Sequence, residues 1–126
     1  MAELILPELS YKVVGALFKV YNELGGGYQE KYYQRAVAKA LRDAELQFQE
    51  QVTVPLLFGS EKIGRYFIDF VIKNEIALEI KATPRFYVRD TKQVLAYLKA
   101  TGFMLGLLAA FGHNGLQLKR ILRGRK

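Results

Sequence analysis

Three β-rich runs stand close together in the middle of the chain and decide its fold class. They cover Phe48–Phe58, Ile63–Ile72 and Glu75–Lys81, with Gly59-Ser60 in the first break between them and Lys73-Asn74 in the second. Each run is rich in β-branched and aromatic residues with a period of two, and breaks of this composition are typical of β-turns. We therefore predict a three-stranded meander.

Helical patterns lie before the meander. From Pro7 to Leu24 apolar residues recur at spacings of three and four, and a second such pattern runs from about Tyr28 to Ala44. The three glycines at positions 25–27 separate the two patterns, because glycine accepts the left-handed backbone of a helix C-cap. The chain is therefore predicted to open with a pair of helices.

A third helix and two more strands are predicted after the meander. The helix covers about Asp90–Thr101, with Asp90 or Thr91 as its N-cap. The strands are Phe103–Phe111 and Leu116–Leu122, around a turn at residues 112–115. The predicted order, ααβββαββ, is that of an α/β (α+β) sandwich.

Composition excludes several classes of protein. A chain of 126 residues, 51% of them hydrophobic, suffices for one compact domain, residues 1–126, with a genuine core. No stretch reaches the ~18 apolar residues of a membrane span, and the first residues carry acids where a secretory signal carries bases. We therefore expect a cytoplasmic protein without a membrane partner. The sequence has no cysteine, so any metal must bind to oxygen ligands and not to thiolates.

The positive charge is concentrated in the last third of the chain. Residues 81–126 hold ten basic and one acidic side chain, against nine basic and eleven acidic in residues 1–80. Such asymmetry is typical of a protein that binds a phosphate backbone, although a basic tail such as Leu118–Lys126 also promotes solubility. The charge alone does not decide between these two interpretations.

One carboxylate interrupts an apolar strand. Asp69 lies in the run Arg65–Ile72, whose middle is apolar on both faces and is therefore expected to be central and buried. A buried carboxylate is costly unless it is protonated, paired or bound to a cation. Asp69 is thus either a structural acid with a protein partner or a metal ligand.

The next strand brings a second acid and a lysine onto one face, since side chains alternate and Glu79 and Lys81 are two residues apart. A hairpin centred on Asn74 places Asp69 opposite Glu79 and Phe67 opposite Lys81, whereas a two-residue turn sends the acids to opposite faces. Like charges at the roughly 5 Å spacing of paired side chains destabilise a sheet. A Mg²⁺ or Mn²⁺ ion would remove this repulsion, and a cross-strand ion pair with Lys81 is the ordinary alternative.

Glu30 shares the apolar stripe of the second predicted helix. Together with Tyr33, Val37 and Leu41 it recurs at spacings of three and four, so it should face the sheet. A carboxylate in that place needs a partner. An acid in the first turn also complements the helix dipole without any chemistry, so both interpretations stay open.

Together these motifs resemble the GxxExxY family. The segment Gly27-Tyr28-Gln29-Glu30-Lys31-Tyr32-Tyr33 fits the signature, and Ile68-Asp69 is followed by Glu79-Ile80-Lys81. That family is similar to the PD-(D/E)XK nuclease superfamily, and the resemblance extends from about Tyr11 to Leu122. It implies a restriction-endonuclease-like core, with a mixed sheet of about five strands flanked by helices.

The resemblance also implies catalytic roles for individual residues. Asp69 and Glu79 would be the metal ligands, with Glu30 as an additional acid on the helix. Lys81 would be the catalytic lysine. Gln93 matches a glutamine that related nucleases carry on the helix after the catalytic strands, although an exposed polar residue is its ordinary interpretation.

Other residues are expected to support this site. Gly27 and Tyr33 belong to the signature, but a tyrosine on a buried helix stripe also suits core packing. Non-specific, salt-dependent contacts to phosphates are expected from four basic residues of the C-terminal third, namely Arg85, Arg89, Lys92 and Lys99.

The expected activity is hydrolysis of phosphodiester bonds in nucleic acid, DNA ahead of RNA, with Mg²⁺ or Mn²⁺ as cofactor. The first alternative is a nucleic-acid-binding module that kept the fold but lost turnover. The second is a subunit of a defence or repair assembly that acts only with partners. An exposed apolar patch and a stable homodimer in solution would favour this second alternative.

Overall fold

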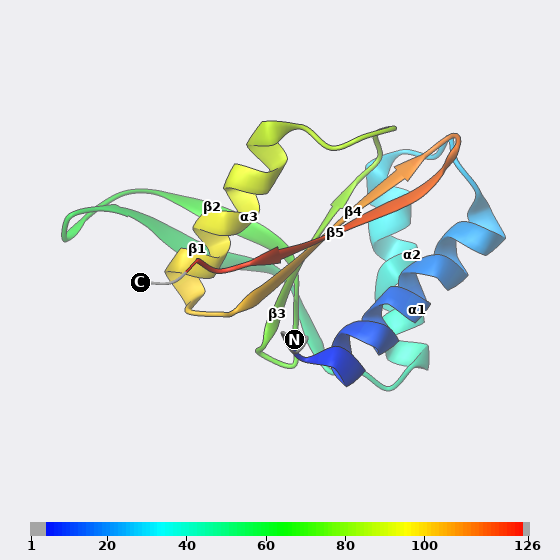
Figure 1. Ribbon diagram of the computed structural model, residues 1–126, viewed down its shortest axis with the longest axis horizontal. Coiled ribbons are helices and arrows are strands. Elements are labelled where there is room, and N and C mark those ends of the chain that lie inside the picture. Colours follow the sequence, from blue (N-terminus) through cyan, green and yellow to red (C-terminus); the bar gives the residue numbers. More distant parts are fainter. Residues whose placement is uncertain (1–4, 125–126) are drawn as a thin grey trace.

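The computed structural model describes residues 5–124, which form a five-stranded sheet with helices on both faces (Figure 1). Residues 1–4, at the acidic N-terminus, and residues 125–126 of the basic tail lie outside the described residues. The elements are α1 (Pro7–Leu24), α2 (Glu30–Asp43), β1 (Phe48–Phe58), β2 (Glu61–Ile72), β3 (Ile76–Lys81), α3 (Val88–Thr101), β4 (Leu105–Gly112) and β5 (Gly115–Leu122).

The strands lie in the sheet in the order in which they follow one another in sequence, β1-β2-β3-β4-β5. The first three strands pair antiparallel, β3 and β4 pair parallel, and β4 and β5 pair antiparallel. The parallel pair is joined through α3, as a parallel pair requires. The predicted order ααβββαββ and the mixed sheet are therefore confirmed.

The helices pack on opposite faces of the sheet. On one face α1 and α2 enclose a core with Leu17, Tyr33 and Leu41, and on the other face α3 packs through Val94 and Tyr97. β3 and β4 lie between these two layers and are almost entirely buried. Among the described residues, no helix is both long and apolar enough to span a membrane.

The structure corrects the predicted start of the third helix. The helix begins at Val88 with Tyr87 as its N-cap, so the prediction that Asp90 or Thr91 is the N-cap was wrong. Asp90 instead occupies the third helical position, where its Oδ2 accepts a hydrogen bond from the backbone N–H of Tyr87 at 3.0 Å. Acids are favoured both at the N-cap and at the third helical position, because from either place the carboxylate can accept hydrogen bonds from free backbone N–H groups at the start of the helix.

The outer half of the β1–β2 hairpin projects from the rest of the molecule, at the left of Figure 1. Phe58 and Ile63 near its turn are 77% and 59% exposed. β2 becomes continuously buried only from Ile68 to Ile72. The predicted burial of this strand is therefore confirmed for its inner half, which lies between the helices.

Candidate active site

The β2–β3 hairpin has the register of a turn centred on Asn74, one of the two alternatives that the sequence left open, but its pairing stops at the acids. Phe70 pairs with Leu78, as a turn centred on Asn74 requires, and this is the last pair of the ladder. Asp69 and Glu79 therefore lie just beyond the paired region. The prediction that they form a ladder pair was too strong, because β2 and β3 separate at this point.

Phe67, which was predicted to lie opposite Lys81, instead pairs with Thr53 of β1. Its ring is 48% exposed. Lys81 pairs on its other side with Ala110 of β4. The prediction of a Phe67–Lys81 pair was wrong for the same reason, since β2 no longer follows β3 beyond Phe70.

β2 is irregular around Asp69. Regular alternation would place Ile68 and Phe70 on one face, yet Ile68 packs in the core under α3 and Phe70 in the core under α1 and α2. In the neighbouring strand, Gln51 has a φ of 51°, a left-handed conformation that is uncommon for residues other than glycine. The acid therefore lies at a local distortion of the sheet.

Asp69 accepts hydrogen bonds on both of its oxygens. Its Oδ2 accepts from the backbone N–H of Ile80 at 2.8 Å, and its Oδ1 accepts from Nε2 of Gln51 at 3.5 Å. The side chain thus takes the place of a strand backbone as the acceptor for β3. Burial raises the pKa of Asp69 above its usual range, against the opposing effects of these bonds and of the charge on Lys81.

The carboxylate of Glu79 has fewer hydrogen-bond partners than that of Asp69. Glu79 is 5% exposed, and its Oε2 lies 3.4 Å from Nζ of Lys81. Its Oε1 is buried and has no hydrogen-bond partner among the described residues. Burial first, and then the charge of Asp69, raises the pKa of Glu79 from 4.5 to about 7, although Lys81 acts in the opposite direction. Such a shift is typical of functional carboxylates.

Lys81 lies between two carboxylates. Besides Glu79, Oδ1 of Asp90 is 3.9 Å from its Nζ, and Asp90 is itself buried. The sequence predicted Asp90 as a helix cap, and its place beside the lysine was not predicted. One signal was available, because Asp90 is the single acid in residues 81–126.

The second helix contributes Glu30 and Gln34. Nε2 of Gln34 donates to Oε2 of Glu30 at 3.2 Å. Burial is the largest cause that raises the pKa of Glu30, followed by the charge of Asp69, while Lys81 lowers it. Glu30 therefore lies within electrostatic range of the acids on the sheet. Gln34 was not predicted, although its spacing of four from Glu30 places it on the same side of the helix.

Tyr33 fixes the loop before α2. Its hydroxyl donates to the carbonyl oxygen of Gly25 at 2.6 Å and accepts from the backbone N–H of Tyr28 at 3.3 Å. Its buried ring stacks on Phe111 with a centroid distance of 4.4 Å. Gly27, in the same loop, has a φ of 99° that suits glycine. Tyr33 is thus a core residue that also holds the segment leading to Glu30.

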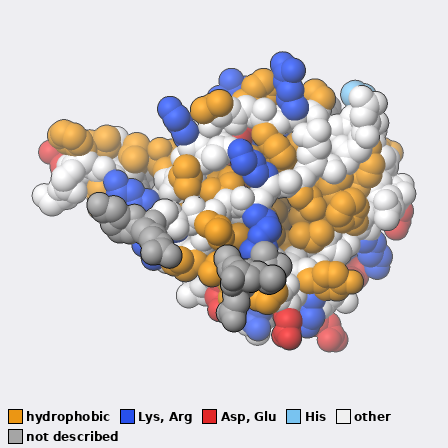
Figure 2. All heavy atoms as spheres, viewed as in Figure 1, with side chains coloured by type: hydrophobic (Ala, Val, Ile, Leu, Met, Phe, Trp, Pro, Cys, Tyr) orange, Lys and Arg blue, Asp and Glu red, His pale blue; other side chains and the backbone are white. Residues whose placement is uncertain are grey.

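A cavity of about 380 Å³ is lined by Lys81, which forms an ion pair with Glu79. Gln93 lies in its wall beside Lys81, and the remaining lining residues are Tyr66, Arg89, Asp90 and Lys92. Gln93 and two of the predicted phosphate contacts therefore gather beside the lysine. Figure 2 shows basic side chains over the surface where α3 begins.

The other two predicted phosphate contacts, Arg85 and Lys99, do not line this cavity. The guanidinium group of Arg85 lies 5.6 Å from the ring centroid of Tyr87, and that of Arg89 lies 4.9 Å from the same centroid. Lys99 lines a second cavity, between α3 and the projecting hairpin. Tyr66 lines both cavities and was not among the predicted site residues.

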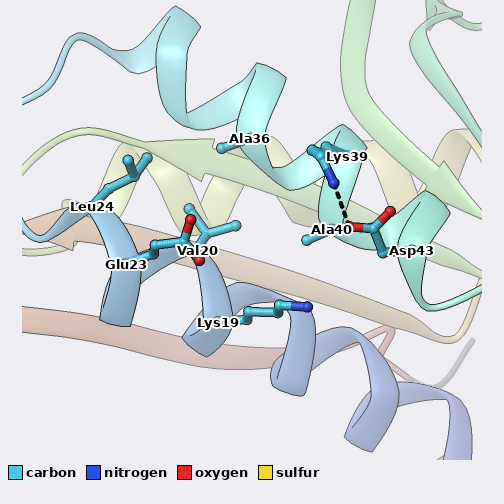
Figure 3. A pocket seen from close by; sticks show the side chains of 8 residues that line it. All are labelled: Lys19, Val20, Glu23, Leu24, Ala36, Lys39, Ala40 and Asp43. Carbon is cyan, nitrogen blue, oxygen red and sulfur yellow. Dashed lines mark hydrogen bonds and ion pairs between the residues drawn. The ribbon is translucent and has the colours of Figure 1, made fainter.

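A groove between α1 and α2 is not a plausible centre for this chemistry (Figure 3). Its volume is about 260 Å³, and its charged side chains include Lys39 and Asp43, which form an ion pair at 2.6 Å. That pair is exposed, and neither Asp69 nor Glu79 lines the groove. The candidate site is therefore the cluster on the sheet.

The donor groups of this cluster suit a hard divalent cation. Within residues 5–124 no three or more His, Cys, Asp or Glu side chains are arranged to hold a metal ion by themselves. Asp69 and Glu79 nevertheless supply two carboxylates, and Mg²⁺ is usually held by one or two carboxylates together with water and substrate phosphates. The unpartnered Oε1 of Glu79 is an oxygen donor of the kind that such an ion prefers.

Comparison with known proteins places this geometry in a family. The sequence matches the PD-(D/E)XK nuclease superfamily over residues 7–121. The crystal structure of SSO0001 is similar with a TM-score of 0.53 and 12% sequence identity, over 94% of this chain and 79% of that one. No curated protein sequence matches. The match to the superfamily covers most of the chain, and the sheet and helices agree with the restriction-endonuclease-like fold, so the chain belongs to the PD-(D/E)XK nuclease superfamily.

Proposed function

We propose that this protein is a nuclease of the GxxExxY type that hydrolyses phosphodiester bonds in nucleic acid, DNA ahead of RNA, with Mg²⁺ or Mn²⁺. One observation carries the proposal: Glu79 is buried beside Lys81, its Oε1 has no partner among the described residues, and Asp69 adds a second acid. Leaving such a group without a cation costs free energy, and a metal ion with a substrate phosphate would offset that cost.

The proposed roles follow from the positions of the side chains. Asp69 and Glu79 hold the divalent ion, with Glu30 on the adjacent helix as a further acid. Lys81, whose ammonium group lies 3.4 Å from Glu79, contacts the scissile phosphate and offsets its charge. Gln93 orients the substrate or the attacking water from the wall of the cavity that it shares with Lys81.

In the proposed reaction, the oxygen of a water molecule forms a bond to phosphorus and one P–O ester bond breaks. A proton from the water ends on the leaving sugar oxygen, which gives a phosphate monoester and a free hydroxyl. A bound divalent ion supplies a Lewis acid and lowers the pKa of coordinated water. The side chains orient the phosphate, and the buried setting strengthens their electrostatic effect.

A cleavage assay tests this proposal. Plasmid DNA, single-stranded DNA and RNA are incubated with Mg²⁺ or Mn²⁺, and in parallel with EDTA. We expect metal-dependent cutting by the natural protein and none by Glu79→Ala. Glu75→Ala is the matched control, since Glu75 is an exposed acid in the same hairpin and should keep full activity. Cutting that persists in Glu79→Ala refutes the assigned site.

The alternative is a binding module without turnover, and one observation favours it. Lys81 already lies within ion-pair distance of Glu79 and Asp90, so it compensates part of the acidic charge without a metal. A folded protein that binds nucleic acid but cuts none of the substrates with either ion would support this alternative.

A further inference from the structure

Two cavities lie on one side of α3 and share one lining residue. The lining of the first cavity, of about 380 Å³, includes Lys81 and Lys92. The lining of the second, of about 360 Å³, includes Lys99 and Leu56. Tyr66 lines both. We refer to the two cavities together as the hairpin groove, since the β1–β2 hairpin forms one wall and α3 forms the other.

One stripe of α3 supplies the helical wall of the hairpin groove. The lining residues recur at spacings of three and four, from Arg89 and Gln93 near the start of the helix to Ala96 and Ala100 near its end. From Arg89 to Ala100 the helix rises by about 16 Å, which is long enough for several nucleotides.

The hairpin groove has a positive rim and an apolar floor. Arg89, Lys92 and Lys99 are all exposed, whereas Asp90 is the only acid among the described residues that line the two cavities. Asp90 is buried and already bound to Tyr87. The rim charge is therefore complementary to a chain of phosphates.

The floor suits the faces of unpaired bases. Pro55, Leu56 and Ala96 are apolar, and the ring of Tyr66 is partly exposed between the two cavities. The Tyr66 ring packs edge-to-face on Tyr97 with a centroid distance of 5.6 Å, which fixes its orientation. Bases expose their faces in a single strand but bury them in a duplex, and aromatic side chains bind such faces by stacking.

We infer that the hairpin groove binds a single-stranded segment of nucleic acid, with a base stacked on Tyr66 and phosphates on Lys92 and Lys99. A single strand would then be the substrate class of the proposed nuclease, and to that extent the inference rests on the proposed function. The binding itself requires neither a metal ion nor cleavage.

Binding in EDTA tests the inference apart from catalysis. Fluorescence anisotropy compares labelled single-stranded DNA and RNA with a DNA duplex of the same length. We expect tighter binding of a single strand than of the duplex. Lys99→Glu should weaken single-strand binding about fivefold at low salt and make it less salt-dependent, because one phosphate contact is lost.

Matched variants test whether binding depends on the hairpin groove or only on the overall positive charge of the protein. Lys12→Glu changes an exposed lysine of α1 by the same charge and should leave binding within about twofold. Tyr66→Ala should weaken single-strand binding roughly tenfold, while Tyr66→Phe should retain it because the ring remains. Ala96→Glu should block the groove, whereas Leu95→Glu, on a half-exposed neighbour outside its lining, should not.

Each outcome distinguishes the inference from the proposed hydrolysis. Three results would overturn the inference that the hairpin groove binds a single strand. They are equal or tighter binding of the duplex, no binding of any probe, and equal effects of Lys99→Glu and Lys12→Glu. Metal-dependent cutting that occurs alongside such a result leaves the nuclease proposal intact. Single-strand binding with the expected variant effects, but without any cutting, supports the groove and refutes hydrolysis.

Discussion

The carboxylate of Glu79 should make the metal-free protein less stable as the pH rises. Its pKa is raised from 4.5 to about 7, mainly because the side chain is buried. Keeping such a group ionised in the folded state at pH 8 costs about 3 kcal/mol relative to the unfolded chain. The substitution Glu79→Gln removes this charge and preserves the shape of the side chain.

The sign of the effect follows from proton binding. A raised folded-state pKa means that the folded protein holds the proton more tightly, so the contribution to stability is complete below pH 4.5 and is lost as the pH rises through about 7. Relative to the natural protein, Glu79→Gln should therefore be more stable at pH 8 than at pH 5, by about 2 to 3 kcal/mol. Other groups titrate in both proteins, and their effects cancel in this comparison.

Urea unfolding in EDTA, followed by circular dichroism at both pH values, measures the difference. Glu75→Gln is the control, because Glu75 is exposed and its substitution should have the same effect at both pH values. A pH-independent effect of Glu79→Gln would show that Lys81 keeps the carboxylate ionised already at pH 5. That result would refute the reasoning that burial dominates at this site.

Four further outcomes are expected in urea unfolding, with EDTA left out where Mg²⁺ is added. Mg²⁺ at a hundredfold excess over its dissociation constant should stabilise the natural protein by about 3 kcal/mol and leave Glu79→Gln unchanged. Tyr33→Phe should cost about 1 to 2 kcal/mol and lower cleavage, because the hydroxyl that holds the loop before α2 is lost. Gly26→Ala should cost about 1 to 3 kcal/mol, since its Cβ would lie 2.6 Å from the carbonyl oxygen of Gly112, whereas Gly15→Ala meets no atom within 4 Å and should stabilise α1 by up to about 1 kcal/mol.

Most of the fold could be predicted because its signals are local. Helix α1 has the predicted bounds, and the turn at Gly59-Ser60 separates β1 from β2 as expected. The register of β2 and β3 could be narrowed to two alternatives because it depends on a single turn, in which Lys73 and Asn74 both adopt left-handed conformations. Such features depend on neighbours in sequence and not on distant contacts.

The parts of the site that were not predicted depend on distant contacts. Asp90 reaches Lys81 only because α3 packs back across the sheet, and Tyr66 lines the hairpin groove only because the hairpin lies beside that helix. Gln51 of β1 donates a hydrogen bond to Asp69 of the neighbouring strand β2, and Gln51 has a left-handed backbone conformation that no sequence rule assigns to glutamine. No periodicity in the sequence encodes these arrangements.

The irregular strand pairing around Asp69 itself supports a functional role for this part of the sheet. The β2–β3 ladder ends next to Asp69, whereas on the other side of β3 the pairing with β4 continues without interruption through Glu79 and Lys81. A left-handed glutamine and an unpartnered buried oxygen each cost about 1 to 3 kcal/mol, and both occur at this place. A continuous apolar strand would avoid these costs, and strain of this kind is characteristic of functional sites. Because the β2–β3 ladder ends here, no backbone pairing joins the two strands between Asp69 and Glu79, where the proposed reaction requires a phosphate to bind.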